Sequence, residues 1–161
     1  MATPPDPMDA LNMFQRDLDR LELTPSEIDP DLFIHLDQPG GYARMTFVTL
    51  RDRTVTAMAV LFAADPTDGV LRFQGFFAVP EVYRNQGRAK DILRAALRHM
   101  AYGFARAKVD AIRVEVIVDP GNIGAQRVAA AAICPIPERI TDEVSGLPIL
   151  RYGATLKHTT H

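Results

Sequence analysis

The chain has 161 residues, of which 47% are hydrophobic and 24% are charged, and its formal net charge is −2. This composition predicts a single globular domain over residues 1–161 that is long enough to bury a real core. The slight negative charge gives no general reason to expect nucleic acid as a partner. The single cysteine, Cys134, excludes an intramolecular disulfide framework and fits a reducing compartment.

Neither a membrane span nor a secretion signal is visible in the sequence. A membrane-spanning helix needs roughly 20 apolar residues, and no run approaches that length. The N-terminus lacks the basic start and apolar stretch of a secretory signal. We therefore expect a cytoplasmic protein without a membrane partner. The proline-rich residues 1–8 are expected to be disordered.

The first half of the chain predicts one helix followed by strands. Asp9 is a candidate cap for a helix that runs to about Leu21. Residues 24–31 are turn-like, with a short helical turn expected there. Runs of β-branched and aromatic residues predict strands over 32–36, 42–51, 54–64 and 70–79. The second and third of these strands are expected to form a hairpin around Asp52 and Arg53.

The second half predicts helices that alternate with strands. Apolar residues recur at helical spacing from about Gln86 to Lys108, and the β-branched run 111–119 predicts a central strand. Asn122 can cap a second helix to about Ala132, and a final hairpin should turn near Ser145 and Gly146. A helix that connects two strands predicts that they run parallel, so we expect an α+β or mixed α/β domain.

A basic turn separates the 70–79 strand from the long helix. It contains Gly87 together with Arg84, Arg88 and Lys90. The first amides of a helix have no partner within it and carry partial positive charge, so a strand, a basic turn and a helix form a candidate anion site. An ordinary loop with a solvated basic face is the alternative.

The residues of this turn resemble the signature of a known family. Arg84–Ala89 matches the pattern Arg/Gln-x-x-Gly-x-Gly/Ala of the GNAT superfamily of N-acetyltransferases, and Val114–Ala132 is similar to that family's strand, asparagine and helix. The similarity is greatest to the branch that acetylates ribosomal-protein N-termini. The resemblance implies a mixed, mostly antiparallel central sheet, in which two parallel central strands splay apart and helices flank the sheet.

The resemblance also implies a site for acetyl-CoA, the acyl donor of the family. The pyrophosphate would lie on the backbone amides of the turn, where Gly87 and Ala89 lack bulk, and pantetheine would pair with the strand edge. Asn122 would lie beside the pantetheine arm, or would serve only as a helix cap. The cofactor-binding residues implied are Phe77, Ala78, Val79, Arg84, Asn85, Gln86, Gly87, Arg88, Ala89, Lys90 and Asn122.

The catalytic residues are less clearly marked. Glu115 is the candidate base for an amine acceptor, although the alternation of the strand also allows it to pair with Arg113 or with a neighbouring strand. Relatives use a tyrosine or a serine where this chain has Ala129 and Ala125, so the usual hydroxyl that protonates the thiolate is missing. The histidines show no metal-ligand spacing, and no metal is expected.

Three functions remain open from the sequence. The chain is a direct-transfer N-acetyltransferase that acts on an amine of a small molecule or a protein N-terminus. Alternatively, it is a catalytically weak or inactive domain that binds acyl-CoA and regulates, or a structural domain whose basic turn binds nothing specific. A homodimer is also open, because relatives often dimerise and the terminal hairpin offers a strand edge.

Overall fold

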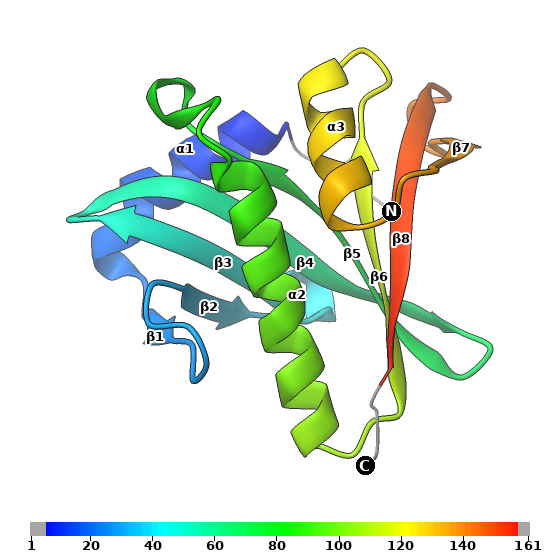
Figure 1. Ribbon diagram of the computed structural model, residues 1–161, viewed down its shortest axis with the longest axis horizontal. Coiled ribbons are helices and arrows are strands. Elements are labelled where there is room, and N and C mark those ends of the chain that lie inside the picture. Colours follow the sequence, from blue (N-terminus) through cyan, green and yellow to red (C-terminus); the bar gives the residue numbers. More distant parts are fainter. Residues whose placement is uncertain (1–5, 158–161) are drawn as a thin grey trace.

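The computed structural model describes residues 6–157, which form one mixed sheet with helices on both faces (Figure 1). Of residues 1–8, which were expected to be disordered, residues 1–5 lie outside the described residues, whereas Asp6 caps α1 and Pro7 and Met8 belong to it. The helices are α1 (Pro7–Asp17), α2 (Arg88–Arg106) and α3 (Ile123–Ala132), with short 3-10 turns at Leu18–Arg20, Pro39–Gly41 and Glu81–Tyr83. The strands are β1 (Thr24–Pro25), β2 (Phe33–Asp37), β3 (Arg44–Arg51), β4 (Thr54–Thr67), β5 (Val70–Ala78), β6 (Ala111–Val118), β7 (Glu138–Thr141) and β8 (Pro148–Lys157).

The eight strands lie in the order β1-β2-β3-β4-β5-β6-β8-β7. Every neighbouring pair is antiparallel except β5 and β6, which run parallel. Helix α2 connects these two strands, and a crossover of this length is what a parallel pair requires. The predicted mixed, mostly antiparallel sheet is therefore confirmed.

The two parallel strands part at their C-terminal ends. Their pairing begins at Leu71 opposite Ile112 and ends at Gly75 opposite Val116. Strand β5 continues to Ala78, still paired with β4 on its other side. The final residues of β5 therefore have no strand partner on the side of β6, and the predicted splay is confirmed.

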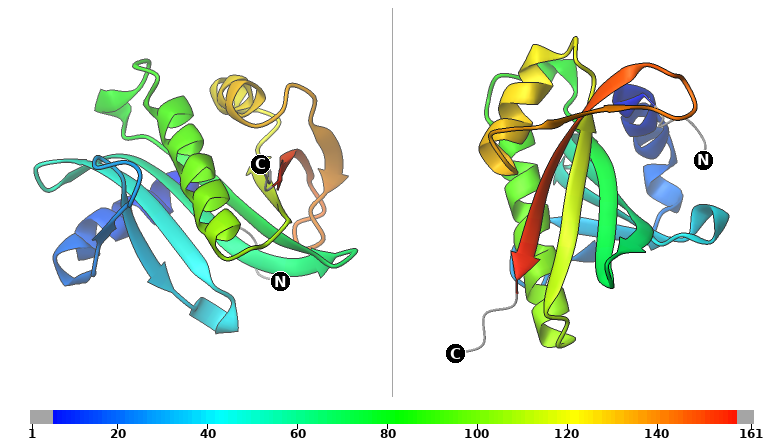
Figure 2. Two further views of the ribbon diagram at one scale, coloured as in Figure 1. Left: turned by 60° about the horizontal axis from the view of Figure 1, so that its bottom comes forward. Right: turned by 90° about the vertical axis from the view of Figure 1, so that its right-hand side faces the viewer.

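Helices pack on both faces of the sheet. Helices α2 and α3 cover one face, and α1 covers part of the other, against β4 and β5 (Figure 2). Alternate residues of β6, such as Val114 and Val116, join the larger core beneath α2 and α3. Val60 and Phe76 belong to the smaller core beneath α1. Because side chains alternate along a strand, the residues between the core positions of β6 face the side of α1.

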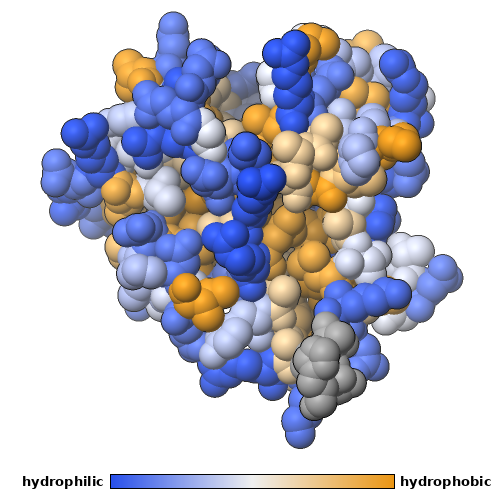
Figure 3. Space-filling view, in the orientation of Figure 1, coloured by the Kyte–Doolittle hydropathy of each residue, from blue (hydrophilic) through white to orange (hydrophobic). Residues whose placement is uncertain are grey.

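The face that carries α2 combines polar and apolar surface. Hydrophilic side chains run along α2, and a hydrophobic strip lies beside it, toward β8 (Figure 3). Phe104 of α2 and Leu156 of β8 are half-buried in this region and pack against the larger core. The apolar side of α2 that its sequence predicts is therefore the side that packs against the core, and its polar side faces solvent. Among residues 6–157, no helix is long and apolar enough to cross a membrane.

The N-terminal segment differs from the sequence prediction in two places. Helix α1 begins at Pro7, because Asp6 rather than Asp9 is its cap and accepts from the amides of Met8 and Asp9 at 2.9 and 3.2 Å. Thr24 and Pro25, expected in a helical turn, instead pair with β2 as the short strand β1.

Candidate functional site

The candidate anion site begins at the uncapped end of α2. Gly87 occupies the N-cap position with φ 75° and ψ 7°, and no side chain caps this helix. A Cβ atom built on Gly87 would meet nothing within 4 Å. The first amides of α2 therefore have no side-chain cap and there is room beside Gly87, which is an arrangement that can bind phosphate at a helix N-terminus.

Two residues of the turn before α2 have a positive backbone φ angle. Asn85 has φ 62°, a left-handed conformation that asparagine tolerates better than most residues, and Gly87 repeats it two residues later. A left-handed residue next to a right-handed one directs successive backbone N–H groups toward a common point, which favours an anion, and Gly87 directly precedes the first helical residue of α2. The glycine of the predicted signature is thus required for the backbone shape as well as for space.

The two arginines of the turn, Arg88 and Arg84, make different contacts. Arg88 is stacked on the ring of Tyr83, with 5.0 Å from its guanidinium carbon to the ring centroid, and its Nε donates to Gln86 Oε1 at 3.1 Å. Arg84 turns back, and its Nε donates to the carbonyl oxygen of Val79 at 2.9 Å. The side chain of Arg88 is therefore fixed in position at the N-terminus of α2. The hydrogen bond of Arg84 instead connects the turn to the residue that follows β5.

The other predicted binding residues border the place where β5 and β6 part. Phe77 is half-buried and Ala78 is buried at the end of β5 that has no partner on the side of β6. Val79, the residue after this strand, is also buried. Asn122 caps α3, and its Oδ1 accepts from the amide of Ala125 at 3.0 Å. The capping interpretation of Asn122 is confirmed, and its role beside a pantetheine arm stays a prediction.

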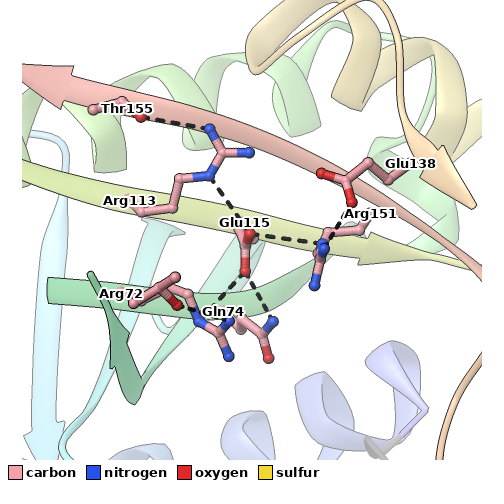
Figure 4. Close-up of polar contacts among 8 residues, drawn as sticks. Arg72, Gln74, Arg113, Glu115, Glu138, Arg151 and Thr155 are labelled. Carbon is pink, nitrogen blue, oxygen red and sulfur yellow. Dashed lines mark hydrogen bonds and ion pairs between the residues drawn. The ribbon is translucent and has the colours of Figure 1, made fainter. Parts of the chain in front are cut away.

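Glu115 lies in the middle of a polar cluster on the α1 side of the sheet (Figure 4). Its side chain is only 6% exposed, and Gln74 Nε2 donates to its Oε1 at 2.9 Å. Three guanidinium groups approach the same carboxylate: the Nε atoms of Arg72, Arg113 and Arg151 lie 3.6, 3.5 and 3.6 Å from its oxygens. The ion pairing that the alternation of β6 allowed is therefore present.

Strand register explains why these side chains meet. Arg72 is opposite Arg113, and Gln74 is opposite Glu115 across the parallel pair. On the other side of β6, Gly153 of β8 is opposite Glu115. A Cβ atom at Gly153 would lie 2.2 Å from Nη2 of Arg113, so the absent side chain makes room for this guanidinium.

The cluster and the basic turn lie on opposite faces of the sheet. Glu115 faces the side of α1, and the N-terminus of α2 lies on the other side. The pair formed by Gln74 and Glu115 is the last one on the α1 side before β5 and β6 separate. A long ligand anchored at the turn could therefore present its end near Glu115 only by passing between the two strands.

Sequence reasoning missed two members of this cluster, Arg72 and Arg151. Alternation along β5 did place Arg72 and Gln74 on one face, which was an available signal. The register between β6 and β8 brings Arg151 within reach of Glu115, and no local pattern gives that register. Arg151 also donates to Glu138 of β7 at 2.7 Å.

The remaining hydroxyl and thiol groups near the predicted site are packing residues. Tyr152 of β8 is 3% exposed within the larger core, and Ala129 is fully buried there. Tyr83 lies beneath Arg88, and the Sγ of Cys134 approaches the carbonyl oxygen of Ile136 at 3.5 Å. Within residues 6–157, no group of three or more metal-binding side chains converges.

A second half-buried polar group lies in the C-terminal half of α2. His99 contacts Ser26, with 3.0 Å between its Nδ1 and the serine Oγ, and packs edge-on against Phe47. Burial lowers the pKa of His99, and the charge of Glu27 partly opposes that shift. His99 also borders an open groove with Met45 and Phe104, which is separate from the basic turn.

Comparison with known proteins identifies the fold. No protein-family model and no curated protein matches the sequence. Among solved structures, an acetyltransferase of the GNAT family from Streptococcus pneumoniae is similar over 96% of this chain and 97% of its own, with TM-score 0.54 and 14% identity. The chain has the GNAT acetyltransferase fold. At this identity, the likeness establishes the GNAT fold and not the activity.

Two further structures with the GNAT fold were determined with coenzyme A. RimL, a ribosomal L7/L12 alpha-N-protein acetyltransferase in complex with coenzyme A, matches 74% of this chain and 66% of its own, with TM-score 0.53 and 13% identity. The NatC complex bound to Gag peptide and CoA contains a chain that matches 98% of this one and 84% of its own, with TM-score 0.50 and 15% identity.

Proposed function

We propose that this protein binds acetyl-CoA at the N-terminus of α2 and transfers the acetyl group directly to an amine. The observation that carries the proposal is the left-handed Gly87 at an uncapped helix end with free space around it. The GNAT fold and the coenzyme A complexes of proteins that share it support the choice of donor.

The residues of the turn would hold the phosphates of the donor. Backbone amides at the start of α2 would donate hydrogen bonds to the pyrophosphate oxygens, and Arg88 and Lys90 would add positive charge. The unpaired edge of β5 at Phe77–Val79 would hydrogen-bond the pantetheine amides as an added strand does. Because Arg84 already donates to the carbonyl oxygen of Val79, we assign Arg84 to the shape of the turn.

Direct transfer needs one proton to leave the amine and one to reach the sulfur. The neutral amine attacks the thioester carbonyl, the new C–N bond forms, and the C–S bond breaks as thiolate leaves. We assign proton removal to Glu115, because it is the carboxylate in the last paired row on the α1 side before the strands part. The buried Ala129 offers no hydroxyl, so solvent protonates the thiolate and turnover is slow.

One observation favours a second function, the binding of acyl-CoA without turnover. All contacts found for the Glu115 carboxylate are to Gln74 and three arginines, which is also the environment of a structural ion cluster. In that case CoA would bind at the turn and no amine would be acetylated.

Release of free CoA over a panel of amines separates the two functions. The panel should contain small amines, polyamines and peptides with free N-termini, because failure with one acceptor would say little. We expect slow release above the hydrolytic background with some acceptor, and Glu115→Gln should depress it and change its pH dependence while CoA binding is retained. Tight CoA binding without release for any acceptor would establish the second function.

A cysteine control tests direct transfer. Cys134 is half-buried beside Pro135 and no basic side chain contacts its sulfur among the described residues, so no covalent acetyl-enzyme is expected. Cys134→Ala should therefore retain activity. Loss of activity in this variant, together with a trapped acetyl-enzyme, would replace direct transfer by a two-step mechanism.

A further inference from the structure

The arginine cluster around Glu115 carries more positive charge than its carboxylates neutralise. Arg72, Arg113 and Arg151 contribute three positive charges, and Glu115 and Glu138 contribute two negative charges, so one positive charge is left over. Arg72 and Arg113 are direct neighbours across β5 and β6, and like charges in that position repel each other. The cluster therefore gains stability from one further negative charge.

The three guanidinium groups are also fixed in position. The Nε atoms of Arg72 and Arg151 are buried against Glu115 without a hydrogen bond, and that of Arg113 points at the same carboxylate. Arg113 lies in the space left by Gly153. One outer nitrogen of each arginine donates to Thr67, Thr155 or Glu138. The side chains keep 23 to 33% exposure, so further N–H groups are available to a ligand. Guanidinium groups fixed in this way are suited to bidentate binding of an oxyanion.

The position of the cluster connects it with the proposed reaction. It lies on the face opposite the N-terminus of α2, beside the place where β5 and β6 part. Helix α1 packs on this face against β4 and β5. The row of Arg72 and Arg113 is two residues from Glu115 along the strands, and both side chains reach along the sheet to within 3.6 Å of its carboxylate. An acceptor with its amine near Glu115 could thus place a second group on these arginines.

We propose that the acceptor is an amine that also carries a carboxylate, which Arg72, Arg113 and Arg151 bind on the open face of the sheet. This inference rests on the proposed acetyl transfer and names the class of acceptor. A carboxylate is favoured over a phosphate, because the single uncompensated charge of the cluster matches one negative charge. Because these guanidinium groups lie within 3.6 Å of the Glu115 carboxylate, the amine and the carboxylate of the acceptor must be joined by a short chain.

Matched acceptors test the proposal in the acetyl-transfer assay. Linear amino acids with two to five methylene groups should be compared with their own amides, which keep the amine and lose the charge. We expect kcat/KM to be at least about tenfold higher for the carboxylates, and Arg113→Gln and Arg72→Gln should each reduce that ratio toward one. If amides and acids are acetylated equally well, the assignment of the acceptor is wrong while the acetyltransferase function stands.

A binding measurement makes the test independent of turnover. Butanoate, which carries one negative charge, should at constant ionic strength raise the melting temperature of the wild-type protein and of Arg88→Gln, which alters only the basic turn. The rise should be lost in Arg113→Gln and reduced in Arg113→Lys, which keeps the charge without the planar fork. If Arg88→Gln alone abolishes the effect, the anion binds at α2 and the proposal fails.

Two further results complete the design. Removal of the competing carboxylate in Glu115→Gln should strengthen butanoate binding, whereas a purely structural cluster would give no binding in either protein. In Gly87→Val, which lacks the proposed phosphate site at α2, inorganic phosphate should stabilise the protein less than butanoate, and the reverse order would overturn the assignment to a carboxylate. If butanoate binds as predicted and no amine is acetylated, the site stands and the proposed enzymatic function fails.

Discussion

Replacement of Glu115 by glutamine isolates the electrostatic contribution of the central carboxylate. The two side chains have nearly the same shape, so the change leaves no cavity and removes one negative charge. Three guanidinium groups then remain within 3.6 Å of a neutral side chain that is 6% exposed. The folded state loses three favourable contacts and keeps the mutual repulsion of the arginines.

The size of the effect follows from burial. Removal of one partner from a fully buried ion pair costs about 3–5 kcal/mol. The arginine side chains here are 23 to 33% exposed, so solvent screens part of their charge. We therefore expect Glu115→Gln to lower the free energy of unfolding by about 2–3 kcal/mol. For a chain of this length, that corresponds to a fall in melting temperature of roughly 5–10 °C.

Urea denaturation near pH 7.5 at low salt measures this free energy. Glu138→Gln is the matched control, because Glu138 also pairs with Arg151 but is 59% exposed, and little change is expected there. Adding Arg113→Gln to Glu115→Gln should restore part of the lost stability, because it removes one repelling charge. If Glu115→Gln is as stable as the wild type, or if the second substitution lowers stability further, the account of the cluster is refuted.

Three other predictions follow from single residues. Gly75→Ala should destabilise the protein by about 3 kcal/mol or more in urea denaturation, because its Cβ would lie 1.6 Å from the carbonyl oxygen of Val60; an unchanged midpoint would contradict this. Burial lowers the pKa of His99 in the folded state, so the unfolded chain binds the proton more readily. Stability should therefore fall as the pH drops below about 6.5, and less so in His99→Gln; equal pH profiles would refute this. Arg88→Ala should weaken CoA binding and flatten its salt dependence in calorimetry, and an unchanged salt slope would remove Arg88 from the site.

Much of the fold could be predicted, because the chain carries strong local patterns. The alternation of β6, the apolar face of α2 and the Asn122 cap are each properties of a short segment. The parallel pairing of β5 and β6 followed from the length of the connection between them. The start of α1 was misplaced, because Asp6 and Asp9 are both good caps and only Pro7 at the first helical position favours the earlier one.

The candidate site likewise has one part that could be predicted from the sequence and one part that could not. The basic turn could be found from sequence, because one glycine and its neighbours determine the local backbone shape. The arginine cluster could not, because Arg72 and Arg151 reach Glu115 only through the registers of three strands that are distant in sequence. The departures from the family pattern at Ala125 and Ala129 were visible in sequence, but the burial of Ala129 required the structure.

Calorimetric titration of CoA into matched glycine variants tests the central claim most directly. Gly87 and Gly146 have nearly the same backbone angle, φ 75° and 72°, and a Cβ atom would meet nothing within 4 Å at either position. Valine at each position therefore carries similar backbone strain, but only Gly87→Val places side-chain atoms where the phosphates would lie. We predict that the wild type and Gly146→Val bind CoA and that Gly87→Val does not. Absence of binding to the wild type near millimolar CoA, or undiminished binding to Gly87→Val, would contradict the site at α2.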